Sequence, residues 1–123
     1  MDIILDTSVI IEIFGGNEQV NTYLSRYKDA VFGITAITEF ELNCVDLKEK
    51  EVIMLNNLPI YDFDKAAGII GGHIFRALKK AGKMPKIKDL LIAATCITHT
   101  KLLLTTDSDF EIFHEFGLTV EVI

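Results

Sequence analysis

Short apolar runs alternate along the chain with longer stretches in which apolar residues recur every three or four positions. Ile3 to Leu5 is apolar without alternation, which is typical of a strand buried on both faces. Residues 58–61 predict an edge strand, because Pro59 cannot donate a hydrogen bond to an interior ladder. The same reasoning predicts further strands at residues 30–34, 102–104 and, with partial alternation, 118–123.

The stretches between these strands have the period of helices. Their predicted ranges are 9–14, 18–28, 35–47, 48–57, a long helix beginning at Asp62 or Asp64, 88–100, and a short helix ending at Phe116. Alternating strands and helices predict an α/β fold with a central parallel sheet of four to five strands and helices on both faces. The 123 residues fit one domain, so we expect a single unit spanning 1–123.

The apolar period also predicts which side chains are buried. We expect the helix over 35–47 to bury Ile37, Phe40, Cys44 and Leu47, and the long helix to bury Ala66, Ile69, Ile70, Ile74, Ala77 and Leu78. Cys44 and Cys96 are predicted to be buried free thiols, since neither belongs to a CxxC pair. The glycines at 68, 71 and 72 cost about 1 kcal/mol each in a helix, which predicts close packing against another helix or a second subunit.

Acidic residues follow two of the predicted strands. Asp6 ends the first strand, and Asp107 and Asp109 follow the strand at 102–104. The carboxyl ends of parallel strands meet at one edge of a sheet, where ligands bind, so we expect these acids to lie close together. Asp89, in the first turn of the helix at 88–100, is expected at the same edge. Asp6 and Asp89 each have a simpler interpretation as helix caps, and Thr7 and Ser8 also offer capping chemistry.

Two glutamates compete for a place in this group. Glu41 shares the inward stripe of its predicted helix with Ile37 and Cys44, whereas Glu39 falls on a polar face with Asn43 and Asp46. We therefore favour Glu41. The alternative is a boundary glutamate whose stem covers apolar surface.

Several carboxylates held close together repel one another unless a cation lies among them. Oxygen ligands without cysteine or histidine favour Mg2+ or Mn2+ over zinc. The predicted sheet would gather Asp6, Glu41, Asp89, Asp107 and Asp109 at this edge, where together they could bind such a cation.

The net charge of −6 argues against a polyanionic partner, but the charges are unevenly distributed. Residues 65–88 contain no acid and carry a run of basic side chains that could contact a polyanion: Arg76, Lys79, Lys80, Lys83, Lys86 and Lys88. A solvated helix face explains the same pattern equally well. No apolar run approaches the ~20 residues that cross a bilayer, and no signal-type segment opens the chain. We therefore expect a soluble, cytoplasmic protein that does not bind a membrane.

Four motifs in this order resemble a PIN domain. They are Asp6-Thr7-Ser8 after the first strand, Ile37-Thr38-Glu39-Phe40-Glu41-Leu42, Lys88-Asp89-Leu90-Leu91-Ile92-Ala93-Ala94, and Leu104-Thr105-Thr106-Asp107-Ser108-Asp109-Phe110. The chain is especially similar to the VapC toxins of prokaryotic toxin-antitoxin pairs. The resemblance implies a three-layer α/β/α fold, Asp6, Glu41, Asp89 and Asp107 as the active-site acids, Asp109 as a further acid, and Ser8 and Thr105 as accompanying hydroxyl residues.

The resemblance also implies an activity and partners. Family members are Mg2+- or Mn2+-dependent ribonucleases that hydrolyse RNA phosphodiester bonds and are usually homodimers, and VapC members are held inactive by a VapB antitoxin. For such a substrate, the basic residues from Arg76 to Lys88 are candidates for binding the RNA backbone. Two alternatives stay open within the family: a nuclease of RNA processing outside a toxin pair, and a non-catalytic RNA- or protein-binding module. A phosphatase that forms an aspartyl phosphate is disfavoured, because it needs a second acid where Ser8 stands.

Overall fold

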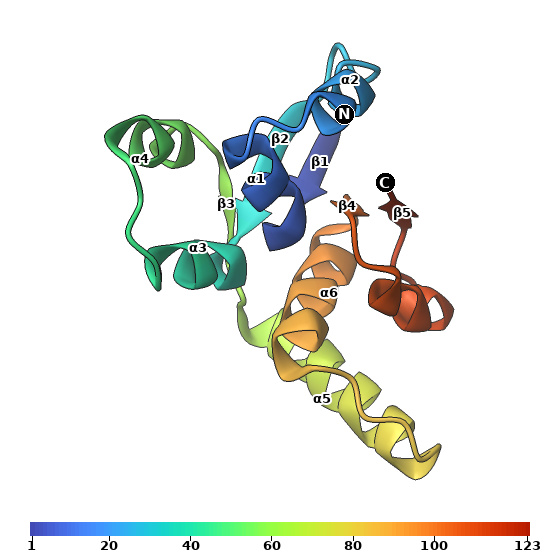
Figure 1. Cartoon of the computed structure of the whole chain (residues 1–123). Coiled ribbons are helices and arrows are strands. Elements are labelled where there is room, and N and C mark those ends of the chain that lie inside the picture. Colours follow the sequence, from blue (N-terminus) through green and yellow to red (C-terminus); the bar gives the residue numbers. More distant parts are fainter.

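The computed structural model describes all 123 residues and contains one sheet of five parallel strands (Figure 1). The strand order is β3-β2-β1-β4-β5, and every neighbouring pair is parallel. The strands are β1 (Asp2–Leu5), β2 (Val31–Thr35), β3 (Ile60–Tyr61), β4 (Leu102–Thr105) and β5 (Val120–Val122). The predicted sheet is confirmed, including the edge position of the segment that follows Pro59.

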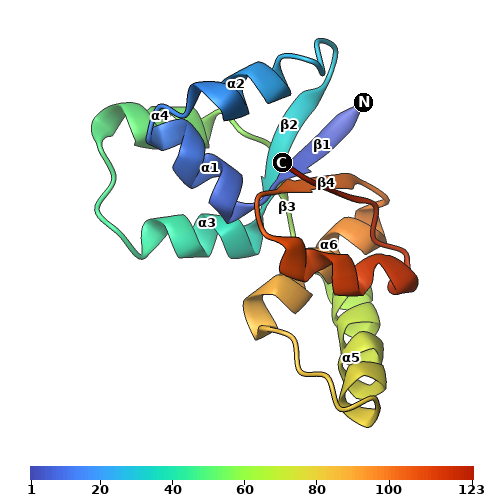
Figure 2. The ribbon, with the colours of Figure 1, turned by 45° about the vertical axis from the view of Figure 1, so that its right-hand side comes forward.

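Helices cover both faces of this sheet, as Figures 1 and 2 show. They are α1 (Thr7–Phe14), α2 (Glu18–Leu24), α3 (Ala36–Asn43), α4 (Glu49–Asn56), α5 (Lys65–Lys80), α6 (Ile87–His99) and the 3-10 turns of η1 (Ser108–Phe116). Ile3 and Leu5 of β1 pack with residues of α1 to α4, whereas Ile4 packs with residues of α5, α6 and η1. Successive side chains of β1 thus pack into two separate hydrophobic cores, one on each face of the sheet. The predicted three-layer α/β/α fold is confirmed.

The order of the strands defines a topological switch point in the sheet. From β1 the chain moves through β2 to β3 on one side, and later places β4 and β5 on the other side. The direction of strand addition therefore reverses between β1 and β4. Ligands of open α/β sheets bind at the carboxyl ends of the strands beside such a reversal.

The helix α3 is shorter than predicted, and this changes its buried face. It ends at Asn43 and buries Thr38 and Leu42. Phe40 points away from that stripe and is 58% exposed, and Cys44 lies beyond the last turn and is also exposed. The predictions that Phe40 and Cys44 are buried are wrong: Phe40 lies within α3 on the side opposite Thr38 and Leu42, so the predicted helical phase was wrong, and Cys44 lies beyond the helix end. Cys96 is fully buried as predicted, and burial raises the pKa of its thiol.

The phase predicted for the first half of α5 is also wrong. Its buried stripe is Ala67, Gly71, Ile74 and Leu78, so Ala66 and Ile69 are exposed. Gly71 explains part of the glycine pattern: a Cβ atom there would lie 3.5 Å from Cβ of Ala94, so α5 and α6 approach closely at this point. Asp64 caps α5 by accepting a hydrogen bond from the backbone N–H of Ala67.

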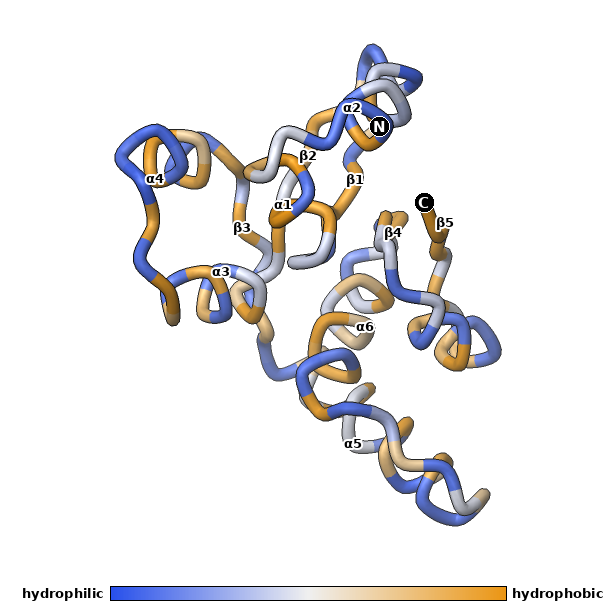
Figure 3. Tube along the Cα trace, viewed as in Figure 1, coloured by the Kyte–Doolittle hydropathy of each residue, from blue (hydrophilic) through white to orange (hydrophobic).

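Hydropathy follows the layers. β1 is hydrophobic along most of its length in Figure 3, whereas the far end of α5 and the loop beyond it are mostly hydrophilic. None of the helices has the length and apolar character needed to cross a membrane.

Candidate active site

Asp6 lies where β1 gives way to α1, at the reversal between β1 and β4. Its backbone N–H donates to the carbonyl oxygen of Leu104 at 2.9 Å, which extends the pairing of the two strands. The residue is 5% exposed and stands at the N-cap position of α1, but its side chain makes no capping hydrogen bond. The interpretation of Asp6 as a side-chain cap is therefore wrong.

Two hydroxyl groups hold the Asp6 carboxylate instead. Ser8 Oγ donates to Asp6 Oδ2 at 2.7 Å, and Thr105 Oγ1 donates to the same oxygen at 2.8 Å. Contrary to the prediction, the Ser8 side chain does not cap α1. Since neither hydroxyl occupies Oδ1, that oxygen stays available to a ligand.

The same two hydroxyls fix the chain beyond β4. Ser8 Oγ accepts from the backbone N–H of Thr106 at 3.1 Å, and Thr105 Oγ1 accepts from that of Asp107 at 3.0 Å. Asp107 in turn accepts at Oδ1 from the N–H of Asp109, 2.9 Å away, and caps η1. The loop carrying Asp107 is thus tied directly to the Asp6 carboxylate.

Glu41 joins the site through a residue that the sequence interpretation treated only as a possible cap. The Thr7 hydroxyl donates to Oε1 of Glu41 at 2.9 Å and lies equally close, 2.9 Å, to the hydroxyl of Thr38. Thr7 and Thr38 are the functional positions that the sequence reasoning missed. Their signal was present in the Asp-Thr-Ser run and in a threonine three residues before the glutamate.

Glu39 lies on the other side of the buried stripe of α3. Its Oε2 atom is buried and has no hydrogen-bond partner, so this side chain takes no part in the hydroxyl network. The structure therefore separates the two glutamates through Thr7, not through the inward stripe with Ile37 and Cys44 that the sequence suggested.

Asp89 stands in the first turn of α6 as predicted, but α6 has no side-chain cap. The pKa of Asp89 is raised from 3.8 to about 6, first because burial penalises the charged carboxylate and then because Asp6 and Asp107 repel it. Glu41 adds a smaller repulsion, and Lys86 acts in the opposite direction. Three acids from three other segments of the chain therefore interact electrostatically with Asp89. We call Asp6, Glu41, Asp89 and Asp107 the acid cluster.

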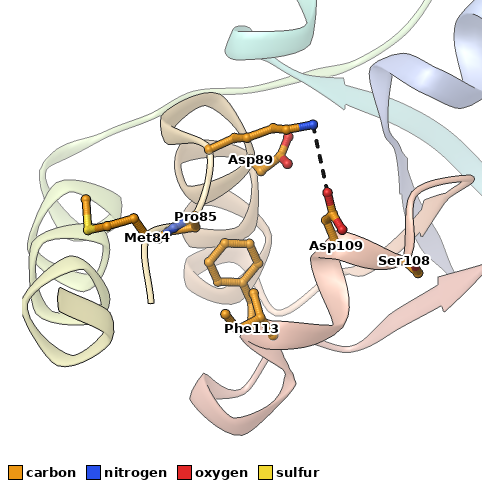
Figure 4. Close-up of a pocket in the computed structure, with 8 residues that line it drawn as sticks. Met84, Pro85, Asp89, Ser108, Asp109 and Phe113 are labelled. Carbon is orange, nitrogen blue, oxygen red and sulfur yellow. Dashed lines mark ion pairs between the residues drawn. The ribbon is translucent and has the colours of Figure 1, made fainter. Parts of the chain in front are cut away.

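Asp109 lies at the margin of this arrangement. Its Oδ2 is 3.8 Å from Nζ of Lys86, and both side chains are largely exposed, so the ion pair is weak. Figure 4 shows Asp89 and Asp109 on facing walls of a pocket of about 460 Å3, with Met84, Pro85 and Phe113 nearby. The pocket opens beside the acid cluster.

The predicted RNA-binding residues fall into two groups. Lys86 and Lys88 border the acid cluster at the start of α6. Arg76, Lys79 and Lys80 lie on α5, and Lys83 follows it; all are exposed. Figure 2 shows the far end of α5 and the loop after it extending away from the sheet.

The chemistry of the acid cluster fits a divalent cation, although its present geometry is open. No three Asp, Glu, His or Cys side chains are arranged so that they hold a metal ion together. The donors at this edge are all carboxylate and hydroxyl oxygens, which suits a hard cation. Burial first, and repulsion by Asp6 and Asp107 second, raise the pKa of Asp89, as expected where carboxylates are held close together at a partly buried site.

An α/β/α fold with acids gathered at its strand reversal defines a class, and comparison with known proteins identifies it: the chain belongs to the PIN domain family, whose sequence model matches residues 3–114. Nucleases of this family generally depend on a divalent metal. Within the family the chain is VapC-like. It is 51% identical over 94 residues to Ribonuclease VapC3 of Methanocaldococcus jannaschii, an alignment that covers 76% of this chain and 97% of that protein.

Solved structures show the same fold. VapBC2 from Rickettsia felis, bound to a DNA fragment from its promoter, matches with a TM-score of 0.79 and 24% identity, covering 100% of this chain and 99% of the other. FitAcB from Neisseria gonorrhoeae matches with a TM-score of 0.75 and 27% identity, covering 98% of this chain and 96% of the other. The resemblance to PIN domains and VapC proteins that the four motifs carry is confirmed.

Proposed function

We propose that this protein is a metal-dependent endoribonuclease that hydrolyses RNA phosphodiester bonds as the toxin of a VapBC-type toxin-antitoxin pair. The observation that carries the proposal is the acid cluster, in which four segments of the chain each deliver one carboxylate to the strand reversal. The 51% identity to Ribonuclease VapC3 supports the same activity.

We assign the metal as Mg2+ or Mn2+, since the donors are oxygen atoms. Asp6, Asp89 and Asp107 would hold it, and Asp109 would reach it only by leaving Lys86. A bound divalent cation supplies a Lewis acid that polarises the phosphate and lowers the pKa of coordinated water towards ~7.

The remaining side chains position these groups. Ser8 and Thr105 fix the Asp6 carboxylate through Oδ2 and leave Oδ1 free. Thr7 fixes Oε1 of Glu41, which leaves Oε2 to orient the attacking water or bind the metal. Lys86 and Lys88 offset the negative field of the acids for an approaching phosphate.

The proposal includes partners. We propose a VapB-like antitoxin as the inhibitor, RNA as the substrate, and a homodimer as the active assembly in the cytoplasm, where RNA is found. A small neighbouring reading frame that encodes a DNA-binding antitoxin, and co-purification of its product with this chain, would support the toxin role. Cleavage activity without such a neighbour would favour a nuclease of RNA processing.

The activity is tested by incubating the purified protein with labelled single-stranded RNA in Mn2+ or in EDTA. Cleavage is expected in Mn2+ and none in EDTA, and Asp6→Asn and Asp89→Asn are expected to remove it. Cleavage that survives the chelator or either substitution would exclude a metal-dependent nuclease centred on these acids.

The choice between the two glutamates needs its own pair of variants. Glu41→Gln should abolish cleavage, because Glu41 is linked through Thr7 to the acid cluster. Glu39→Gln should leave cleavage intact. The reverse pattern would show that the wrong glutamate has been assigned.

A further inference from the structure

Phe40 is an exposed aromatic side chain at the edge of the acid cluster. It is 58% exposed and directly precedes Glu41 in α3. The buried residues of the helix, Thr38 and Leu42, lie on the opposite side, so packing of α3 gives Phe40 no role. A single exposed apolar residue needs no explanation by itself, and its neighbours decide what it does.

The neighbour of the ring is a cation. Nζ of Lys88 lies 5.8 Å from the centroid of the Phe40 ring, within the range of a cation-π contact. Lys88 directly precedes Asp89, as Phe40 precedes Glu41, and α3 packs beside α6. The pair of Phe40 and Lys88 therefore joins the two helices that carry two of the four acids.

We propose that Phe40 is a stacking platform for a nucleobase of single-stranded RNA next to the scissile phosphate, with Lys88 turning from the ring to the phosphate when RNA binds. The proposal rests on the proposed nuclease function and adds a substrate-positioning residue to it. An aromatic ring accepts any base, because every base has a π face. Only an unpaired base is free to stack, which makes the preferred substrate single-stranded.

The charges around Phe40 favour a nucleotide over a protein partner. The residues beside it are Glu39, Glu41 and Lys88. The centre of a protein interface is depleted of charged residues, whereas a nucleotide presents an apolar base face joined to an anion. A chain of net charge −6 also needs a local cation and an uncharged contact to hold RNA near four carboxylates.

The absence of tryptophan from the chain provides a direct test. Phe40→Trp introduces a single tryptophan, whose fluorescence can be excited selectively over that of the three tyrosines. The variant is titrated with a 12-nucleotide single-stranded RNA in EDTA, so that no cleavage occurs. Saturable quenching is expected, and duplex RNA of the same length should quench weakly. Val31→Trp is the matched control, because Val31 is 52% exposed but opens β2, at the opposite end of the sheet, and should not be quenched.

Two further variants separate stacking from simple apolar contact. Phe40→Leu keeps an apolar side chain but loses the π face, so its affinity for the single strand in EDTA should fall about tenfold. Phe40→Tyr keeps the ring and should bind within about twofold of the unmodified protein. Wild-type affinity in Phe40→Leu would overturn the proposal.

The outcomes distinguish this proposal from the function on which it rests. Cleavage in Mn2+ by the unmodified protein, without quenching in Phe40→Trp, would remove the platform and leave the nuclease. Quenching without any cleavage would keep the platform and remove the nuclease. Acrylamide quenching in the absence of RNA shows whether another molecule covers the tryptophan of Phe40→Trp. If acrylamide does not quench it at high protein concentration but quenches it increasingly as the protein is diluted, a second copy of the chain covers this face and the platform is wrong.

Discussion

Two carboxylates of this protein each accept hydrogen bonds from two hydroxyl groups, but only one of them lies among other acids. Asp6 accepts hydrogen bonds from the hydroxyls of Ser8 and Thr105 on a single oxygen, and Glu121 of β5 accepts two from Tyr23 and Tyr27, also on a single oxygen. These tyrosine bonds lower the pKa of Glu121. Asp6 stands among other acids and instead raises the pKa of Asp89.

The difference teaches how to separate a structural carboxylate from a functional one. Glu121 has hydroxyl donors and no acid contributes to its shifted pKa, and the hydrogen bond from Tyr23 ties β5 to α2. Asp6 has equivalent donors, yet the charge around it stays uncompensated. Its hydroxyls hold it in position for a group that the protein alone does not supply.

The largest contrast is expected when both pairs of hydroxyls are removed. Ser8→Ala with Thr105→Val should lower RNA cleavage about 10- to 100-fold, as is typical when groups that hold metal ligands are lost. Tyr23→Phe with Tyr27→Phe should leave the cleavage rate unchanged. Rates on one labelled RNA, measured in saturating Mn2+, decide the comparison, and equal losses in the two double variants would show that the hydroxyls around Asp6 are only structural.

Thr7→Val sharpens the same comparison at one residue. The variant keeps the shape of the side chain and removes the hydrogen bond to Glu41, so cleavage should fall about tenfold, chiefly in kcat. Thr22→Val, on the exposed surface of α2, is the control and should behave as the unmodified protein. A change confined to KM would assign Thr7 to RNA binding rather than to positioning Glu41.

Glu121→Gln should affect stability and not activity. Replacing the charged acceptor of two tyrosine hydroxyls should lower the free energy of unfolding by about 1 kcal/mol at pH 7. Because the folded pKa of Glu121 is lowered, the stability it contributes is present above its unfolded pKa and is lost as pH falls. Denaturant titrations at pH 7 and pH 3.5 should show a loss only at the higher pH; cleavage that also falls would contradict a purely structural role.

Asp89 should show the opposite dependence on pH in the metal-free protein. Its pKa is raised from 3.8 to about 6, so its ionisation in the folded state costs stability as pH rises through this window. Asp89→Asn should therefore unfold at a temperature a few degrees higher at pH 7, and this advantage should shrink towards pH 4. Melting curves of the two proteins in EDTA at pH 7 and pH 4 measure this difference. A difference in melting temperature that does not depend on pH would show that burial and repulsion do not destabilise the charged form of Asp89.

The fold class was predictable because apolar periods record burial, and a parallel sheet of four to five strands follows from them; the order of the strands came only from the structure. Errors arose in helical phase and at a helix end: Phe40 lies on the exposed side of α3, and Cys44 follows the end of this helix at Asn43. The positions of Asp6, Asp89 and Asp107 followed from strand and helix ends. The link from Thr7 to Glu41 joins residues 34 apart and depends on how α3 packs beside α1, which no local pattern states.

The central claim is that Asp6, Asp89 and Asp107 hold a divalent cation with Glu41 beside it, and titration calorimetry with Mn2+ tests it most directly. The metal-free protein should bind Mn2+, with Asp89→Asn and Asp6→Asn losing that binding and Glu121→Gln retaining it. Binding should also raise the melting temperature of the unmodified protein more at pH 7 than at pH 5, where the Asp89 carboxyl competes for a proton. Mn2+ binding that persists unchanged in Asp89→Asn and Asp6→Asn would contradict the account.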